Sequence, residues 1–227
     1  MKLPRLFGRA VLAVRTARFS ALSLPKAIKS EADYDNLDYR DMLIQFDNAR
    51  SEQHILDAFE DWGEELNEKA LCVLTDSIID KHIVLGPRFT NTCAPVIAHY
   101  LGLMTRDSSH SFGYMVQNLA QMGVSSERLW STIFAKFETE HMEQYIPVAI
   151  LNRLFVHLSA WKSPPPALLR RVFDELVKFA GRLPGEEFEL LQQVMHEREA
   201  KLAPLLGGAV HAPLNQGQAT APSLEDH

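Results

Sequence analysis

Nine histidines give this chain its most obvious capacity for metal chemistry. One motif, Glu138-x-x-His141, has the spacing that di-iron bundles use, with two ligands one turn apart on one helix face. Such a centre also needs a second Glu-x-x-His and two further carboxylates, and the sequence contains no second copy. Glu140 and Glu143 flank His141, which is typical of a solvated acidic turn. We therefore predict no metal site and no cofactor.

Motifs for nucleophilic and phosphate chemistry are missing from the sequence. It contains no His-Glu-x-x-His, no Gly-x-Ser-x-Gly, no Walker-type loop and no Gly-x-Gly-x-x-Gly. Cys72 lies in an apolar segment that predicts a helix, where a core thiol is a simpler explanation than a nucleophile. Its spacing from Cys93 fits neither a zinc module nor a disulfide framework. We predict no catalytic residue and a protein that is not an enzyme.

Three tryptophans offer either base-stacking platforms or core anchors. Trp130 and Trp161 fall in register with Leu169 and Met122 in the repeats described below, which favours packing between hairpins. Trp62 follows an acidic run and is the one that we expect to anchor a partner helix.

The clearest functional hint is the distribution of charge. Residues 31–70 carry 13 acids and three bases, a net charge of −10. Residues 145–183 carry two acids and six bases, a net charge of +4. These six bases are Arg153, Lys162, Arg170, Arg171, Lys178 and Arg182. We predict that they contact RNA phosphate or an anionic partner, with solvated helix faces as the alternative.

The periodicity of apolar residues predicts an all-α fold of stacked helical hairpins, an α-solenoid-like array with a period of about 37–41 residues. One common shift along the chain brings ten apolar positions into register, which two unrelated hairpins of similar length rarely do. The first five of these positions are Phe112, Met115, Val116, Leu119 and Met122. In the same order they coincide with Leu151, Leu154, Phe155, Leu158 and Trp161. One hairpin cannot bury its apolar stripe alone, so neighbours must stack.

Composition and the positions of Gly and Pro divide the 227 residues into four segments. Residues 51–206 form the hairpin repeat domain, with turns at Gly86-Pro87, Gly123, residues 163–166 and Pro184-Gly185. Residues 21–50 form an acidic arm, either helical or extended, and residues 207–227 form a tail too polar to order alone. No run of about 18 apolar residues exists, so we predict no transmembrane helix.

Residues 1–20 resemble a mitochondrial presequence. The first 30 residues carry seven bases and no acid, and apolar positions from Leu3 to Val14 share one helix face. The sequence Arg18-Phe19-Ser20-Ala21 resembles a processing site with arginine two residues before the cut. An ordinary basic surface helix is the alternative. We predict location in the mitochondrial matrix or on the matrix face of the inner membrane.

Residues 111–137 and 150–176 resemble the 37-to-39-residue helical repeats of organellar RNA-associated proteins. These are the heptatricopeptide and octotricopeptide classes, which include the helical arrays of FAST-kinase-like mitochondrial proteins. The resemblance covers about half of the chain and rests on helices such as residues 151–158 and 168–176. The octotricopeptide Pro-Pro-Pro-x-x-Trp run is missing, because Pro164-Pro165-Pro166 is followed by Ala167-Leu168.

This resemblance implies a scaffold or binding subunit of a mitochondrial ribonucleoprotein, the mitochondrial ribosome or its assembly machinery. The expected partners are protein subunits of that complex and, through the basic patch, ribosomal RNA. The alternative is an accessory structural subunit of mitochondrial ATP synthase or a respiratory complex.

Overall fold

The chain folds into α-helices, as the apolar period predicts. The computed structural model describes residues 24–34 and 36–207, and within them it contains ten α-helices and no strand. The helices pack as sequential antiparallel pairs, consistent with stacked helical hairpins. The presequence-like segment and the tail from residue 208 lie outside the described residues. None of the described helices is long and apolar enough to cross a membrane.

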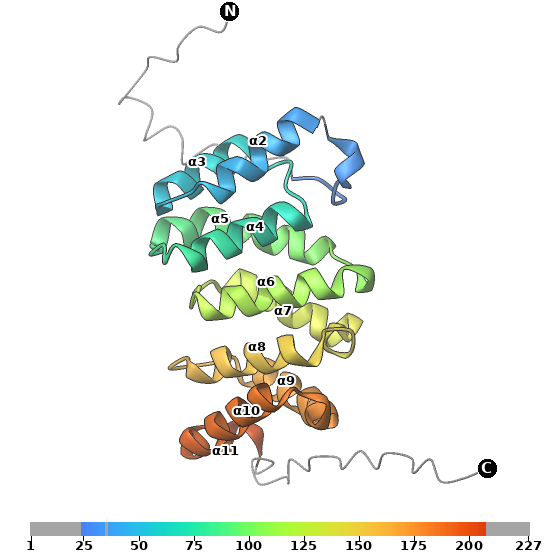
Figure 1. Cartoon of the computed structure of the whole chain (residues 1–227), viewed down its shortest axis with the longest axis vertical. Coiled ribbons are helices and arrows are strands. Elements are labelled where there is room, and N and C mark those ends of the chain that lie inside the picture. The colour runs from blue at the N-terminus through green and yellow to red at the C-terminus, as the bar shows by residue number, and fades with distance from the viewer. Residues whose placement is uncertain (1–23, 35, 208–227) are drawn as a thin grey trace, which may run out of the picture. The chain divides into compact units, whose positions relative to one another are not determined.

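The first compact unit comprises described residues from 24 to 111 together with Val124–Ile133. It contains α2 (Asn36–Asp47), α3 (Glu52–Trp62), α4 (Glu68–Asp80) and α5 (Pro87–Leu103). Helix α2 packs on α3 and on α4, and α3 packs on α5, so the hairpin α2–α3 lies on the hairpin α4–α5 (Figure 1). Phe46 and Phe59 join α2 to α3 with ring centroids 5.8 Å apart, and both side chains are fully buried.

The second unit comprises Phe112–Gly123 and the described residues from Phe134 onward. It contains α8 (Val148–Ala160), α9 (Pro166–Phe179), α10 (Gly185–Glu197) and α11 (Glu199–Leu206). The contacts repeat the pattern of the first unit, because α8 packs on α9 and α10, and α11 packs on α9 and α10. Helices α6 (Ser109–Gln121) and α7 (Glu127–Glu140) each give residues to both units.

The helix boundaries confirm the predicted period. Helix α6 begins at Ser109 and α8 at Val148, and the starts of α7 and α9 are separated by the same shift. From α8 to α10 the shift is slightly shorter, and from α4 to α6 it is slightly longer. All of these shifts agree with those that the apolar positions predict, because one buried stripe recurs in each unit.

Prolines and capping side chains fix where several of the helices begin. Pro87 begins α5 and Pro166 begins α9, where proline's missing N–H costs nothing. Ser51 and Asn67 cap α3 and α4 by accepting hydrogen bonds from His54 N–H and Ala70 N–H. Residues 36–47, which the sequence analysis assigned to an acidic arm, form α2, the first helix of the stacked pairs in the described chain.

Candidate interaction surface

Four of the six predicted basic side chains form ion pairs within the second unit. Arg171 Nε lies 2.9 Å from Glu143 Oε1, and Arg153 reaches Glu187 Oε1 at 2.7 Å. The other two pairs lie within α9. Arg170 with Asp174 and Lys178 with Glu175 are 3.1 Å and 2.7 Å apart.

Three of these partner carboxylates are buried or nearly so. The exposed side-chain fraction is 5% for Glu143, 7% for Glu175 and 13% for Glu187. A buried carboxylate is costly unless a cation or hydrogen-bond donor compensates it. The hydrogen bond to Glu175 and its negative charge raise the pKa of Lys178 above its usual value. Arg153, Arg171 and Lys178 therefore compensate buried or nearly buried carboxylates, whereas Arg170 forms an exposed pair.

The remaining two predicted bases are exposed. Lys162 lies in the turn between α8 and α9, and Arg182 ends the short helix η5 (Ala180–Arg182). The Arg182 guanidinium carbon lies 4.9 Å from the centroid of the Phe179 ring. Arg153, Arg170 and Lys178 also remain about half-exposed beside their partner carboxylates, so Arg171 is the one base of the six that is mostly covered.

The Glu138-x-x-His141 motif does not form a ligand pair on one helix face. Helix α7 ends at Glu140, and His141 follows in the left-handed backbone region with φ of 53°. Its ring Nδ1 lies 2.9 Å from Arg171 Nη2. Within the part of the chain that the structure describes, no three His, Cys, Asp or Glu side chains gather as metal ligands do.

Both thiols are wholly or partly buried, and all three indole N–H groups donate hydrogen bonds within the protein. Burial raises the pKa of Cys72 to about 12 and that of Cys93 well above its usual value, so both remain protonated at neutral pH. Trp130 is 8% exposed and its indole N–H donates to the Val124 carbonyl oxygen at 2.7 Å. Trp161 donates in the same way to the Ala120 carbonyl at 2.9 Å. Trp62 is half-buried and donates to Gln45 Oε1 at 2.7 Å.

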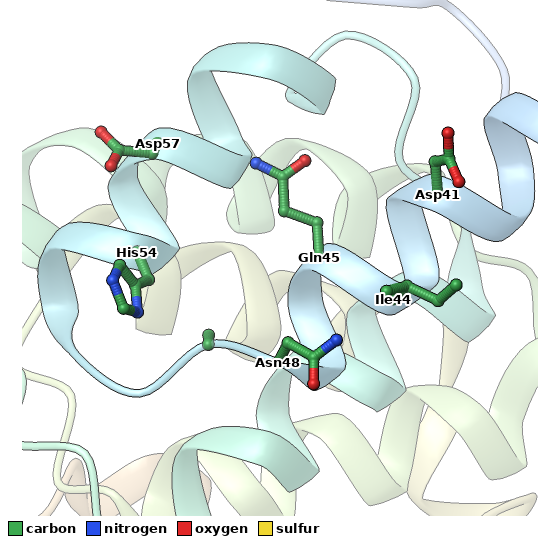
Figure 2. Close-up of a pocket in the computed structure, with 7 residues that line it drawn as sticks. Asp41, Ile44, Gln45, Asn48, His54 and Asp57 are labelled. Carbon is green, nitrogen blue, oxygen red and sulfur yellow. The ribbon is translucent and has the colours of Figure 1, made fainter.

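A groove that the sequence analysis missed lies between α2 and α3 in the first unit. It has a volume of about 410 Å³. Figure 2 shows its six labelled residues, which are Asp41, Ile44, Gln45, Asn48, His54 and Asp57, with Ala49 at the loop between the helices. The side chains of Asp41 and Asp57 flank it from α2 and α3 respectively.

The outer face of α2 carries two exposed aliphatic side chains. Ile44 is 44% exposed, and Leu37, two helical turns earlier on the same face, is 71% exposed. The opposite face carries Met42 and Phe46, both fully buried. The sequence could have indicated this face. Leu37 and Ile44 are apolar at helical spacing and lie outside the buried stripe that contains Met42 and Phe46.

The groove is held in shape by hydrogen bonds. The amide of Gln45 accepts from Trp62 Nε1 and donates to Asp61 Oδ2 at 3.0 Å, which ties α2 to the end of α3. The backbone N–H of Arg50 donates to His54 Nδ1 at 3.2 Å, which leaves Nε2 to carry the hydrogen in the neutral ring. A preformed wall reduces the entropy lost when a partner binds.

Comparison with known proteins gives no matching family model and no similar curated protein. The functional argument therefore starts from the hairpin architecture, the α2–α3 groove and the exposed remainder of the basic patch.

Proposed function

We propose that this protein is a non-catalytic scaffold subunit of a mitochondrial ribonucleoprotein, the mitochondrial ribosome or its assembly machinery. The observation that carries the proposal is the stacked-hairpin architecture, in which successive apolar stripes form the core and the remaining helix faces are available to neighbours. The basic, acid-free first 30 residues support a mitochondrial address.

Contact with RNA is restricted in this proposal to a few side chains, chiefly Lys162 before α9 and Arg182 after it. Lys162 and Arg182 are exposed, whereas the half-exposed Arg153, Arg170 and Lys178 are already paired with carboxylates. A side chain that already neutralises a buried carboxylate releases little free energy when it meets phosphate, because breaking the first pair costs as much. The patch therefore suits a subunit that touches RNA locally while protein neighbours supply most of its binding energy.

The internal pairing of Arg171 and Lys178 favours a second candidate, an accessory structural subunit of mitochondrial ATP synthase or a respiratory complex. In that case the exposed bases meet acidic protein surfaces or anionic lipid head groups, and RNA is not involved.

Ultraviolet cross-linking in intact mitochondria tests the RNA contact. The Lys162→Glu/Arg182→Glu variant should lose most cross-linked RNA, because two exposed charges are reversed without breaking a buried pair. The matched control, Arg40→Glu/Arg128→Glu, makes the same charge change at exposed positions of the first unit. Equal cross-linking in both variants, or none in the wild type, would reject the RNA contact and leave the second candidate.

A further inference from the structure

We propose that the groove between α2 and α3 binds a basic amphipathic helix of a partner protein. The inference rests on the proposed scaffold function, whose partner it names by chemical class. It is carried by three observations: exposed Ile44 in the groove with exposed Leu37 farther along the same face of α2, an acidic side chain from each helix, and a preformed shape.

The apolar component is concentrated on α2. In the part of the chain that the structure describes, four large apolar side chains are exposed, namely Leu37, Ile44, Val84 and Tyr145. Two of the four lie on one face of α2, two helical turns or about 10 Å apart. A partner helix that docks through positions i, i+3 or i+4, and i+7 presents anchors over the same length.

The charge of the walls selects a cationic partner. Asp41 is exposed on α2, and Asp57 on α3 accepts a hydrogen bond from the Gln53 amide at 2.8 Å while its side chain remains beside the groove. Residues 31–70, which include both helices, carry a net charge of −10. Such a surface repels RNA and anionic lipid head groups, so a protein segment rich in Lys or Arg is the complementary occupant.

Within the described residues of the first unit, α2 makes its main helix contacts through its core face. Its core face packs on α3 and α4, with Met42 and Phe46 fully buried. Within the described residues the other face keeps Leu37 and Ile44 exposed. A partner helix would occupy the place that a preceding hairpin takes in the stack.

Fluorescence anisotropy with the purified full chain tests the proposal. The probe is a labelled amphipathic peptide of about five helical turns, with Leu at positions i, i+3, i+4 and i+7 and Lys on both flanks. A second peptide has Glu in place of every Lys, and a third has the same composition with the apolar spacing scrambled. We expect only the first peptide to bind, with an affinity that falls as the salt concentration rises.

Variants locate the binding site. Ile44→Asp and Asp41→Lys/Asp57→Lys should each weaken binding by about tenfold or more. The control Asp80→Lys/Glu138→Lys makes the same charge change at exposed positions away from the groove and should retain the wild-type affinity. Far-UV circular dichroism and melting temperature check that each variant is folded, as expected for exposed positions.

Three results would overturn the proposal. The first is no binding of the basic peptide, and the second is binding that Ile44→Asp leaves unchanged or that the scrambled peptide reproduces. The third is a dimer of the free chain in size-exclusion chromatography that Ile44→Asp dissociates, because a second copy would then occupy the groove. All three leave the scaffold function standing, since membership of a mitochondrial particle is measured independently.

Discussion

The indole N–H of Trp161 donates a hydrogen bond to the backbone carbonyl of Ala120, 2.9 Å away in space and 41 residues earlier in the chain. Ala120 lies in the last turn of α6, and its carbonyl also accepts from the Gly123 backbone N–H at 3.1 Å. The shift that carries α8 onto α10 also carries Trp161 onto Arg198, whose guanidinium donates to the Val156 carbonyl of α8 at 2.9 Å. In both cases the residue that follows one helix donates to a backbone carbonyl of the preceding equivalent helix.

The same position in the first unit is Lys81. Its ammonium group donates to Ser77 Oγ at 2.6 Å and lies 3.9 Å from the carboxylate of Asp47, the last residue of α2. Three different side chains thus interact with the preceding equivalent helix from one register position. A position occupied by Lys81, Met122, Trp161 and Arg198 in successive units is difficult to detect from the apolar pattern.

Replacement of Trp161 by Phe tests the hydrogen bond to Ala120. The variant keeps an aromatic ring but removes the donor to Ala120, so the free energy of unfolding should fall by about 1 kcal/mol. Urea denaturation followed by circular dichroism measures the change. A loss below about 0.3 kcal/mol would show that the hydrogen bond adds little to the contact between α6 and α8.

The adjacent arginines Arg170 and Arg171 should differ strongly in their effect on stability. Arg171→Met leaves Glu143, which is 5% exposed, without its cation, and should cost about 2–3 kcal/mol of unfolding free energy. Arg170→Met breaks only an exposed pair with Asp174 and should cost less than about 0.5 kcal/mol. Equal effects of the two substitutions in urea denaturation would contradict the structural role assigned to Arg171.

Gly113 permits a close approach between α6 and the residue that precedes Pro147. A Cβ atom at Gly113 would lie 2.6 Å from Ile146 Cγ2, and Ile146 is only 5% exposed. Gly113→Ala should therefore destabilise the protein by about 1–3 kcal/mol, whereas Ile146→Ala in the same chain should recover part of that loss.

The control for that substitution is Gly185→Ala at the start of α10, where an added Cβ meets no atom within 4 Å. This variant should be neutral or slightly stabilising, because alanine restricts the unfolded chain more than glycine does. Thermal melts compare the stability of the three variants. A Gly113→Ala protein as stable as the wild type would contradict the close packing of Gly113 against Ile146.

Stability should decline at high pH through Tyr100. Burial raises the pKa of its hydroxyl group to about 12, and the hydroxyl donates to the Gly63 carbonyl at 3.2 Å. In the unfolded chain a tyrosine ionises near pH 10. Above that pH the unfolded state binds fewer protons than the folded state, so this contribution is complete below about pH 10 and is lost by about pH 12.

The measurement is the free energy of unfolding in urea at several pH values from 9 to 12. Tyr100→Phe should be less stable than the wild type at pH 9 and should lose less stability as the pH rises. Parallel curves for the two proteins would show that Tyr100 ionisation is not coupled to folding.

The sequence predicts the helices and their period because burial of one apolar stripe recurs at a fixed spacing. It also predicts the turns, since Pro87, Gly123 and Pro166 restrict or permit specific backbone angles. The division at residue 51 does not coincide with the start of the helices, because α2 buries Met42 and Phe46 within a segment dominated by acids.

A count of charges along the chain could not predict the ion pairs that the six bases form. Within residues 145–183 the bases exceed the acids, but Glu143 and Glu187 lie just outside that range and pair with Arg171 and Arg153 in space. A pair between residues 28 or 34 positions apart depends on how two hairpins stack. The groove between α2 and α3 was missed for the same reason, because it depends on the packing angle of one pair.

Density-gradient sedimentation of the tagged chain from gently lysed mitochondria, with and without RNase, tests the central claim most directly. We predict that the protein migrates with a large particle and moves to the top of the gradient after RNase treatment. Migration that RNase does not change but that depends on the detergent would assign the protein to the membrane complex instead. Migration as a free monomer in both gradients would contradict a scaffold function in either complex.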